Sequence, residues 1–250
     1  MVRSEDSQFL TSFLVDESLV IDAGSIGLAP MSVQDPVRHL FISHSHLDHI
    51  ASLPLFLENV YDPTADPVTI YCSATTLEAM QKNLFNDVIW PDFIALGRTV
   101  SPFLNVEVIE SGDTVEVGRH RVTAVDVPHV VDTFGFIVEG DGASIVIASD
   151  TAPGEELWTV AAERSNLAGV FLECSFPESM RWLADEAQHL TPSLYAGEIR
   201  KIGRPVRNIA LHIKPSTRET VVAELESEGL PLFEVGDSGK VYEFPASDPA

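Results

Sequence analysis

The residues with the clearest chemical potential lie in one short segment, residues 44–49, which reads His-Ser-His-Leu-Asp-His and follows an apolar run. Imidazole nitrogens and carboxylate oxygens are ligands that zinc, manganese and iron favour in proteins. A strand that ends here places His44 and His46 on the same side, and the turn that follows brings Asp48 and His49 to a neighbouring point. Three of the eight histidines in the chain would be unusual in a merely solvated turn. The segment therefore predicts half of the ligand shells of two adjacent divalent metal ions.

Further candidate ligands lie at the ends of other strand-like runs. They are His129 after the run 122–127, Asp150 after the run 145–147, and His212 after Ala210-Leu211. An acid or imidazole at such a place is half-buried, so it must be paired or metal-bound. Taken singly, each could be an ordinary surface residue, and their significance depends on their order along the chain.

That order, a His-x-His-x-Asp-His cluster followed by a histidine, an aspartate and a last histidine, resembles the signature of the metallo-β-lactamase superfamily. The resemblance implies an α/β fold, a four-layer αββα sandwich of two mixed sheets flanked by helices, formed as a single hydrolase domain over residues 1–250. It also implies two divalent metal ions, with zinc as the first expectation and manganese or iron as alternatives, because this mixture of nitrogen and oxygen ligands accommodates all three.

The ligands that the resemblance implies fall into two sets that share Asp150. One ion would be held by His44, His46, His129 and Asp150, and the other by Asp48, His49, Asp150 and His212. Asp22 follows the apolar run 19–21, and the resemblance makes it a residue that orients the histidine loop. An ordinary turn acid is the alternative interpretation of Asp22.

Four other segments resemble the class II cyclic nucleotide phosphodiesterases. They are Glu-Cys-Ser-Phe-Pro at 173–177, His-Leu-Thr-Pro at 189–192, His-Ile-Lys-Pro at 212–215, and the stretch 83–93 with its Ile-Trp-Pro. The resemblance runs from about Thr11 to Phe244. Members of the family begin with an extra strand and a glycine-rich turn, whereas only ten residues precede Thr11. We therefore expect either a trimmed chain or the loss of that strand.

The family resemblance implies hydrolysis of the 3′,5′-cyclic phosphodiester of cAMP, or of cGMP, to a 5′-nucleotide. The alkoxide that leaves is strongly basic, and His189 is the candidate donor of its proton, with Glu173 holding the imidazole. Asp48 is counted with these two as catalytic as well as a ligand. The alternative for His189 is a residue that leads into the helix beginning near Thr191.

Residues that would recognise the substrate are less clearly indicated. Asn86, Trp90 and Phe93 could line a nucleoside pocket, because aromatic faces suit purine stacking. A role in the apolar core or in a dimer contact is an equally good interpretation of the two aromatic residues. Lys214 and Arg218 could contact phosphate, or could be exposed residues at the start of a helix.

Charge and composition exclude several classes of partner. The net charge is −23, from 38 acidic and 15 basic residues, so a long nucleic acid would be repelled. We therefore expect a small cyclic nucleotide as the partner. No run reaches the ~18 apolar residues that suggest a membrane span. With no signal-peptide core and only two cysteines, we expect a cytoplasmic protein with reduced thiols. A homodimer is one expected assembly.

The pattern of apolar residues and turns predicts mixed strands and helices. Strands are expected at 13–15, 19–22, 39–43, 68–71, 106–109, 114–117, 121–127, 134–138, 144–149, 169–173, 208–212 and 240–244. A tight hairpin is expected at 139–142. Helices are expected at 75–83, 193–202 and from Ser216 to Gly229, with capping boxes at Thr75 and Ser216 and a Thr191-Pro192 start for the middle one.

Other functions share parts of this pattern. A ribonuclease of the tRNase Z type would use the same metal ligands, although the negative charge argues against it. A lactonase or thioesterase is a second alternative, and His189 with Glu173 favours instead a leaving group that needs a proton. A sensor that binds metal without turnover is a third, and the complete ligand set argues against it.

Overall fold

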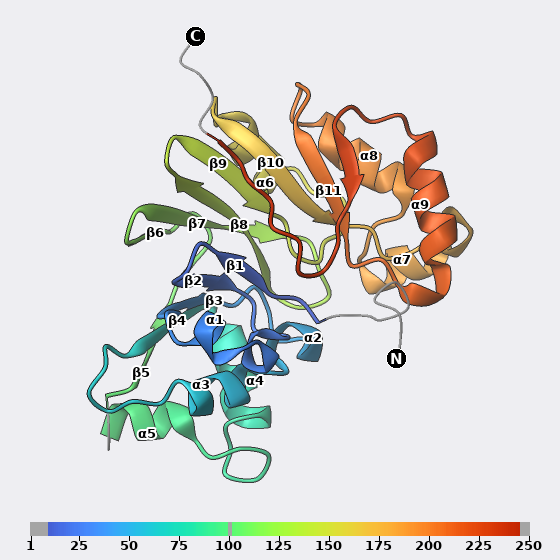
Figure 1. The fold of residues 1–250 in the computed structure, drawn as a ribbon. Coiled ribbons are helices and arrows are strands. Elements are labelled where there is room, and N and C mark those ends of the chain that lie inside the picture. Colours follow the sequence, from blue (N-terminus) through green and yellow to red (C-terminus); the bar gives the residue numbers. More distant parts are fainter. Residues whose placement is uncertain (1–9, 100–101, 246–250) are drawn as a thin grey trace. The chain divides into compact units, whose positions relative to one another are not determined.

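The computed structural model describes residues 10–99 and 102–245. These residues fall into two compact units, an N-terminal unit of residues 10–110 and a C-terminal unit of residues 111–245 (Figure 1). The expected single domain over residues 1–250 stays a prediction.

The N-terminal unit is built on a five-stranded mixed sheet with the strand order β1-β2-β3-β4-β5. Its strands are β1 (Phe13–Val15), β2 (Leu19–Ile21), β3 (His39–Phe41), β4 (Val68–Cys72) and β5 (Leu104–Val108). Strand β1 runs antiparallel to β2, and the other neighbours are parallel. The helices of this unit are η2 (Ile26–Leu28), α1 (Met31–Gln34), α2 (Leu47–Ile50), α3 (Leu53–Asn59), α4 (Ala74–Asn83) and α5 (Phe93–Thr99).

The core of the N-terminal unit lies between this sheet and its helices (Figure 1). Leu40 and Ile70 of the sheet are fully buried in one cluster with Phe56 of α3, Met80 of α4 and Ile94 of α5. Burying such side chains contributes about 1.5–3 kcal/mol each. This packing fixes the carboxyl end of β3, from which the histidine loop starts.

The C-terminal unit is built on a seven-stranded mixed sheet with the order β12-β11-β10-β9-β8-β7-β6. Its strands are β6 (Thr114–Val117), β7 (His120–Val127), β8 (Thr133–Gly140), β9 (Ala143–Ile147), β10 (Leu167–Glu173), β11 (Arg207–Leu211) and β12 (Phe233–Val235). The pairs from β9 to β12 are parallel and those from β6 to β9 are antiparallel. Its helices are α6 (Glu156–Ala162), η3 (Glu178–Met180), α7 (Arg181–Ala187), α8 (Pro192–Arg200), η4 (Pro215–Thr217) and α9 (Arg218–Ser227).

Helices α6, α8 and α9 cover one face of the second sheet. Trp158 of α6, Tyr195 of α8 and Leu225 of α9 pack in one buried cluster with Val146 of β9 and Leu172 of β10. In each unit helices connect the parallel strands, so these strands point their carboxyl ends to one edge of their sheet. The candidate residues after β9, β10 and β11 therefore share that edge.

Most of the expected strands are present, and the hairpin at residues 139–142 is confirmed. Strands β8 and β9 pair antiparallel, and Asp141 and Gly142 have φ values of 49° and 80°. Positive φ at both central residues is the geometry of a tight hairpin turn. The expected start of the middle helix is also confirmed, with Thr191 before α8 and Pro192 in its first turn.

Both expected capping boxes are wrong. Helix α4 begins earlier, because Ser73 Oγ accepts the hydrogen bond from Thr76 N and Thr75 lies inside the helix. At the other position the 3₁₀ turn Pro215–Thr217 precedes α9, and Thr217 rather than Ser216 is the residue before the helix, with no side-chain cap. A Ser or Thr next to the true cap gives nearly the same sequence signal, so the pattern located each helix only to within about two residues.

The expected strand at residues 240–244 is also wrong, and β12 at Phe233–Val235 was not expected. Residues 240–244 form an irregular strap instead. The rings of Tyr242 and Phe244 pack edge-to-face on Phe171, at centroid distances of 5.3 and 5.8 Å, and the Arg207 guanidinium lies over both rings. The strap is therefore fixed by aromatic side chains, where a strand would use ladder hydrogen bonds.

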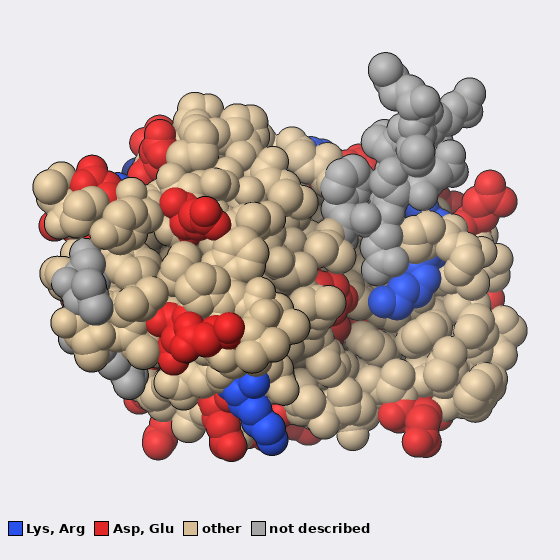
Figure 2. All heavy atoms as spheres, turned by 90° about the horizontal axis from the view of Figure 1, so that it is seen from below, with Lys and Arg blue, Asp and Glu red and all other residues tan. Residues whose placement is uncertain are grey.

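Among the described residues, no helix combines the length and the apolar character needed to cross a bilayer. Acidic side chains are scattered over the face shown in Figure 2, whereas lysine and arginine occur in few places on it. This matches the net charge of −23.

Candidate functional site

The histidine loop of the N-terminal unit, residues 44–49, follows β3, includes the start of α2 and carries two pairs of candidate donors. His44 and His49 are fully buried, and the rings of His44 and His46 are 4.6 Å apart at their centroids. Donor atoms of His44 and His46 lie within 4.8 Å of each other, and His49 Nε2 is 4.0 Å from Asp48 Oδ2. The loop thus gathers all four expected donors of this unit within short range.

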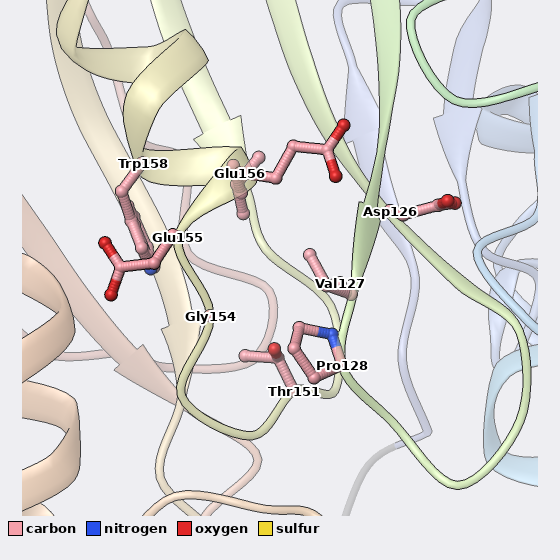
Figure 3. Close-up of a pocket in the computed structure, with 9 residues that line it drawn as sticks. Asp126, Val127, Pro128, Thr151, Gly154, Glu155, Glu156 and Trp158 are labelled. Atoms are coloured by element: carbon pink, nitrogen blue, oxygen red, sulfur yellow. The ribbon is translucent and has the colours of Figure 1, made fainter.

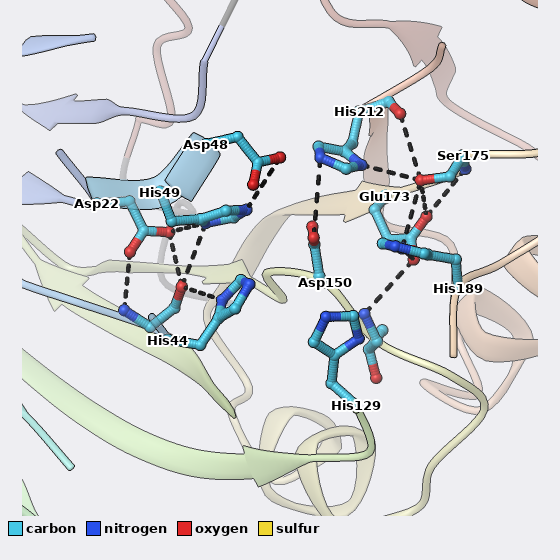
Figure 4. A network of polar contacts seen from close by, with 12 residues as sticks. Asp22, His44, Asp48, His49, His129, Asp150, Glu173, Ser175, His189 and His212 are labelled. Atoms are coloured by element: carbon cyan, nitrogen blue, oxygen red, sulfur yellow. Dashed lines mark hydrogen bonds and ion pairs between the residues drawn. The ribbon is translucent and has the colours of Figure 1, made fainter. Parts of the chain in front are cut away.

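A buried hydrogen-bond chain, which we name the Asp22–Ser43 relay, orients two of these histidines (Figure 4). Asp22 Oδ2 lies 2.7 Å from His49 Nδ1 and 2.8 Å from Ser43 Oγ, which in turn lies 3.0 Å from His44 Nδ1. An ionised carboxylate only accepts, so Ser43 donates its single proton to Asp22 and accepts from His44. Both rings then carry a proton on Nδ1 and a lone pair on Nε2, the nitrogen suited to a metal ion. Asp22 therefore orients the histidine loop, as expected.

The C-terminal unit brings together the other expected ligands, each after a strand end. Asp150 is buried, and one of its oxygens lies within 4.8 Å of a ring nitrogen of His129. Its Oδ2 is 3.8 Å from His212 Nε2. His129 Nδ1 donates to the Gln188 carbonyl at 3.1 Å, which again leaves the lone pair on Nε2. Asp150 is therefore near both histidines of its unit.

Glu173, Ser175 and His189 form a second chain of hydrogen bonds, the Glu173–Ser175 relay, in the same unit (Figure 4). His189 Nδ1 is 2.7 Å from Glu173 Oε1, and Ser175 Oγ is 2.9 Å from both Glu173 Oε2 and His212 Nδ1. Glu173 also accepts from the backbone N–H groups of Ser175 and Leu190. A buried carboxylate with so many donors is fully satisfied, so it can hold two imidazoles in fixed orientation.

Burial lowers the pKa of His189, but the hydrogen bond and charge of Glu173, together with the charge of Asp150, outweigh this effect. The pKa of His189 is therefore raised above its ordinary value. A raised pKa favours the protonated ring, which is the form that can act as an acid. Lys214 opposes this shift from nearby, so its charge reaches the site.

Several residues at these strand and helix ends adopt a left-handed backbone conformation. The φ values are 61° for Asp22, 58° for Ser149, 53° for Gln188 and 57° for His212. This region is unfavourable for residues other than glycine, and such strain concentrates at functional sites, where the surrounding structure holds it. Ser149 precedes Asp150 and Gln188 precedes His189, so the strain sits at or next to candidate functional residues.

The donors in each unit fit a divalent metal ion. They combine imidazole nitrogens whose tautomer is fixed by hydrogen bonding with carboxylate oxygens, and pairs of them lie within 4.8 Å. Each unit therefore holds a His/Asp cluster that could bind metal. The chemistry of these donors does not distinguish zinc from manganese or iron.

The aromatic residues considered for substrate binding have structural contacts in the N-terminal unit. The Phe93 ring lies 6.1 Å from Phe85 and 5.6 Å from Phe103, and Phe93 packs, partly buried, against the core cluster. Asn86 Oδ1 accepts from the backbone of Val88 and Ile89 and shapes the loop before α5. These contacts favour the core interpretation of Phe93 and a loop-forming role for Asn86.

A cavity of about 330 Å³ lies in the C-terminal unit next to candidate ligands (Figure 3). Its lining includes Pro128 and Thr151, the chain neighbours of His129 and Asp150, and three carboxylates at Asp126, Glu155 and Glu156. Burial, followed by the charges of Glu156 and Asp132, raises the pKa of Asp126. The crowding of like charges indicates a hollow that would not favour an anion.

Ser43, Ser175 and Gln188 take part in the site but were not expected from the sequence. Their contributions are a hydroxyl or a backbone carbonyl, and serine is common in loops for other reasons. The sequence signal that could have identified the two serines is their position, since Ser43 directly precedes His44 and Ser175 follows Glu173 by two residues.

The fold is the metallo-β-lactamase fold. The metallo-β-lactamase fold protein YhfI from Bacillus subtilis superposes with a TM-score of 0.73 at 16% identity, covering 93% of this chain and 90% of that one. The crystal structure of unliganded yeast PDE1 gives a TM-score of 0.69 at 23% identity, over 82% of this chain and 67% of that one.

Sequence comparison narrows the class to a family. The sequence profile of the class-II cAMP phosphodiesterases matches residues 16–143, so the chain belongs to that family. A probable 3′,5′-cyclic-nucleotide phosphodiesterase of Yersinia pestis is 26% identical, covering 82% of this chain and 68% of that protein. A ribonuclease Z of Mycobacterium bovis is 30% identical, over 65% of this chain and 59% of that protein.

Proposed function

We propose that the chain is a metal-dependent phosphodiesterase that hydrolyses 3′,5′-cyclic nucleotides, cAMP or cGMP, to 5′-nucleotides. The observation that carries the proposal is the His189–Glu173 pair, at 2.7 Å, attached through Ser175 to His212. A proton donor fixed beside candidate metal ligands suits a reaction whose leaving group is a basic alkoxide. Membership of the class-II family supports this substrate class.

The proposal includes two divalent metal ions, zinc first, with manganese or iron as alternatives. His44, His46, His129 and Asp150 would hold one ion, and Asp48, His49, Asp150 and His212 would hold the other. When bound, such ions supply Lewis acidity toward phosphoryl oxygens and lower the pKa of a water molecule. The fixed tautomers of His44, His49, His129 and His212 support these assignments.

The protein's own residues then position and protonate the substrate. His189 gives the proton on Nε2 to the departing 3′ oxygen, while Glu173 keeps Nδ1 protonated and the ring in place. A general acid of this kind contributes about 10²–10⁴-fold to turnover. Lys214 is close enough to affect His189 electrostatically and is the proposed contact for a phosphate oxygen.

Charge supports a small substrate. The excess of 38 acidic over 15 basic residues opposes a long polyanion, whereas bound cations make the field locally positive for one phosphodiester. The 30% identity to a ribonuclease Z makes RNA cleavage the second candidate. Reduced, buried Cys72 and Cys174 support the cytoplasm as the proposed location, and a homodimer remains a proposed assembly.

The main test measures metal content and hydrolysis on the same preparation. Purified protein is assayed at equal concentration with cAMP, cGMP and a precursor tRNA, before and after chelation and after return of zinc, manganese or iron. We expect 5′-nucleotide formation that chelation abolishes and metal restores. Faster cleavage of precursor tRNA would favour the ribonuclease, and binding of cAMP without formation of AMP would favour a sensor.

Replacing Asp150 tests the shared ligand. Asp150→Ala should remove at least one of the two ions and abolish turnover, because both proposed ligand sets include this carboxylate. Asp126→Ala is the matched control, since Asp126 is an exposed acid of the same unit that lines the neighbouring cavity. Full metal occupancy in Asp150→Ala would contradict a bridging role.

A further inference from the structure

Ser175 is a fully buried serine with an unusually dense set of polar contacts. Its hydroxyl lies 2.9 Å from Glu173 Oε2, 2.9 Å from His212 Nδ1 and 3.4 Å from His189 Nδ1. Its backbone N–H donates to the same Glu173 oxygen at 2.9 Å. One side chain thus connects a carboxylate with two imidazoles.

The direction of these hydrogen bonds follows from the number of protons. A hydroxyl has one proton and two lone pairs, and an ionised carboxylate only accepts. With the Ser175 proton on Glu173, the hydroxyl accepts from His212, so Nδ1 of His212 carries the proton. The lone pair of His212 is then on Nε2, the nitrogen 3.8 Å from Asp150 Oδ2. Neutral histidine exposed to water would have no hydrogen bond that enforces this tautomer.

The N-terminal unit contains a closely similar arrangement, formed by different residues. Ser43 Oγ is 2.8 Å from Asp22 Oδ2 and 3.0 Å from His44 Nδ1, and its backbone N–H donates to Asp22 at 2.7 Å. Even the longer contact recurs, because Ser43 Oγ is 3.4 Å from His49 Nδ1. Two independent occurrences of one hydrogen-bond pattern indicate that the serine hydroxyl has a specific task.

We propose that Ser175 is a positioning residue that lets a single carboxylate, Glu173, fix both a metal ligand and a proton donor. Its hydroxyl donates to Glu173 and accepts from His212, so Glu173 orients His212 through Ser175. His189 donates to Glu173 directly. The roles given to His212 and His189 rest on the proposed function. The tautomer that Ser175 imposes on His212 is independent of the proposed function.

The same side chains could also be interpreted as a third metal-binding group, since donor atoms of Glu173, His189 and His212 lie within 4.8 Å of one another. The hydrogen bonds favour the relay instead. Both oxygens of Glu173 and the Nδ1 atoms of both rings already have partners at 2.7–2.9 Å. A cation there would have to displace protons from both rings.

The first experiment measures histidine tautomers in metal-free protein. Chelator-treated, ¹⁵N-histidine-labelled protein is examined by two-bond ¹H–¹⁵N correlation spectra, with the His212 and His189 signals assigned from His212→Asn and His189→Asn. We expect His212 in the Nδ1–H form in the native protein. Ser175→Ala should shift His212 toward the Nε2–H form and leave His189, which Glu173 holds directly, in the Nδ1–H form.

Two further variants separate the hydroxyl from the packing. Ser175→Thr keeps a hydroxyl and should keep the His212 tautomer. Ser43→Ala, the matched control, should alter His44 and leave His212 unchanged. If Ser175→Ala does not fold, Ser175→Cys, which is similar in size and a weak acceptor, provides the same comparison. An unchanged His212 tautomer in the hydroxyl-free variant would overturn the proposal.

The second experiment measures metal affinity and cAMP hydrolysis of the same variants. Loss of an orienting partner should weaken binding of one of two zinc ions about 10–100-fold, and Ser175→Thr should restore most of it. A tautomer shift with no hydrolysis in any form would refute the proposed function and keep the role of Ser175. Hydrolysis by the native protein, together with an unchanged His212 tautomer in Ser175→Ala, would support the proposed function and refute the role of Ser175.

Discussion

The Asp22–Ser43 relay and the Glu173–Ser175 relay reach nearly the same hydrogen bonds by different routes. In the N-terminal unit the acid and the serine follow neighbouring parallel strands, β2 and β3. In the C-terminal unit both come from the end of one strand, β10, two residues apart. The extra methylene of glutamate gives a carboxylate on the same strand the reach that aspartate has across strands.

The proposed roles of the histidines differ more between the two relays than their hydrogen-bond partners do. The first relay holds His44 and His49, which we assign to two different ions. The second holds His212, assigned to one ion, and His189, assigned to proton donation. Each relay fixes the tautomer and orientation of an imidazole, and on the proposed function the group facing its Nε2 decides whether that imidazole binds metal or delivers a proton.

The strongest test of the difference in roles replaces His49, which contacts Asp22 directly, and His189, which contacts Glu173 directly. His49→Ala should lose metal, because His49 is a proposed ligand. His189→Ala should keep both ions while its turnover of cAMP falls at least ~100-fold, because only the acid is lost. Metal analysis and steady-state kinetics on the same samples measure both effects. Unchanged turnover in His189→Ala would remove His189 from the mechanism, and loss of metal there would make it a ligand like His49.

Replacing the carboxylate of each relay should affect the affinities for the two ions differently. Asp22→Asn should weaken both ions about 10–100-fold, since Asp22 supports His44 and His49. Glu173→Gln should weaken one ion only, through Ser175 and His212, because an amide supplies a single acceptor oxygen. Titration of metal-free protein with zinc against a chromophoric chelator resolves the two affinities. Equal weakening of both ions in Glu173→Gln would show that the relays are not specialised.

Glycine substitutions compare the rigidity of the two units. A Cβ at Gly24 would lie 2.1 Å from the Asp48 carbonyl and 2.7 Å from the backbone of Thr11, so backbone would have to move. A Cβ at Gly169 would instead meet the ring of Phe244, which belongs to the strap. We expect Gly24→Ala to lower the free energy of unfolding by about 2 kcal/mol and Gly169→Ala by about 1 kcal/mol.

Urea unfolding followed by circular dichroism measures these two values. Metal content distinguishes them further, because only the Gly24 variant displaces the backbone of a proposed ligand, Asp48. A larger loss of stability in Gly169→Ala would indicate that the strap is held more rigidly than the histidine loop.

The smallest expected effect concerns the pH dependence of stability in the C-terminal unit. Burial raises the pKa of Glu178, but hydrogen bonds from Ser193 and Thr191 outweigh it, so the pKa of Glu178 is lowered. The stabilisation is therefore present above the ordinary glutamate pKa and is lost as the pH falls through the lowered value. Glu178→Gln should remove this dependence, with an effect of about 0.3–1 kcal/mol at the start of α8.

Unfolding midpoints in urea between pH 3 and pH 7 measure this pH dependence of stability. The native protein and Glu178→Gln should converge at the acidic end and separate toward neutral pH. A constant difference between them across the range would mean that Glu178 acts through packing rather than through its charge.

The positions of the candidate ligands could be predicted from the sequence, because each follows a strand whose apolar run is easily recognised, while their role as ligands stays a prediction. Asp150 and His212 follow β9 and β11, parallel strands of one sheet whose carboxyl ends share an edge, and His44 follows β3 of the other sheet. The pairing of Glu173 with His189 also followed from the family resemblance, and the structure places them 2.7 Å apart.

Other features depend on contacts that a sequence does not reveal. Ser43 and Ser175 acquire their role only when a carboxylate and an imidazole fold around the hydroxyl. The strap at residues 240–244 alternates like a strand, yet Tyr242 and Phe244 pack on Phe171 and Arg207 instead of extending the sheet. Helix starts were misplaced where Thr75 and Ser216 lie near the residues that actually precede α4 and α9.

The left-handed conformation of Ser149 has a consequence for how this protein can evolve. Glycine adopts that conformation freely, so Ser149→Gly would relieve about 1–2 kcal/mol of steric energy. The same change would loosen the turn that sets the direction of the neighbouring aspartate. Selection for heat resistance and selection for catalytic speed would therefore pull this position in opposite directions.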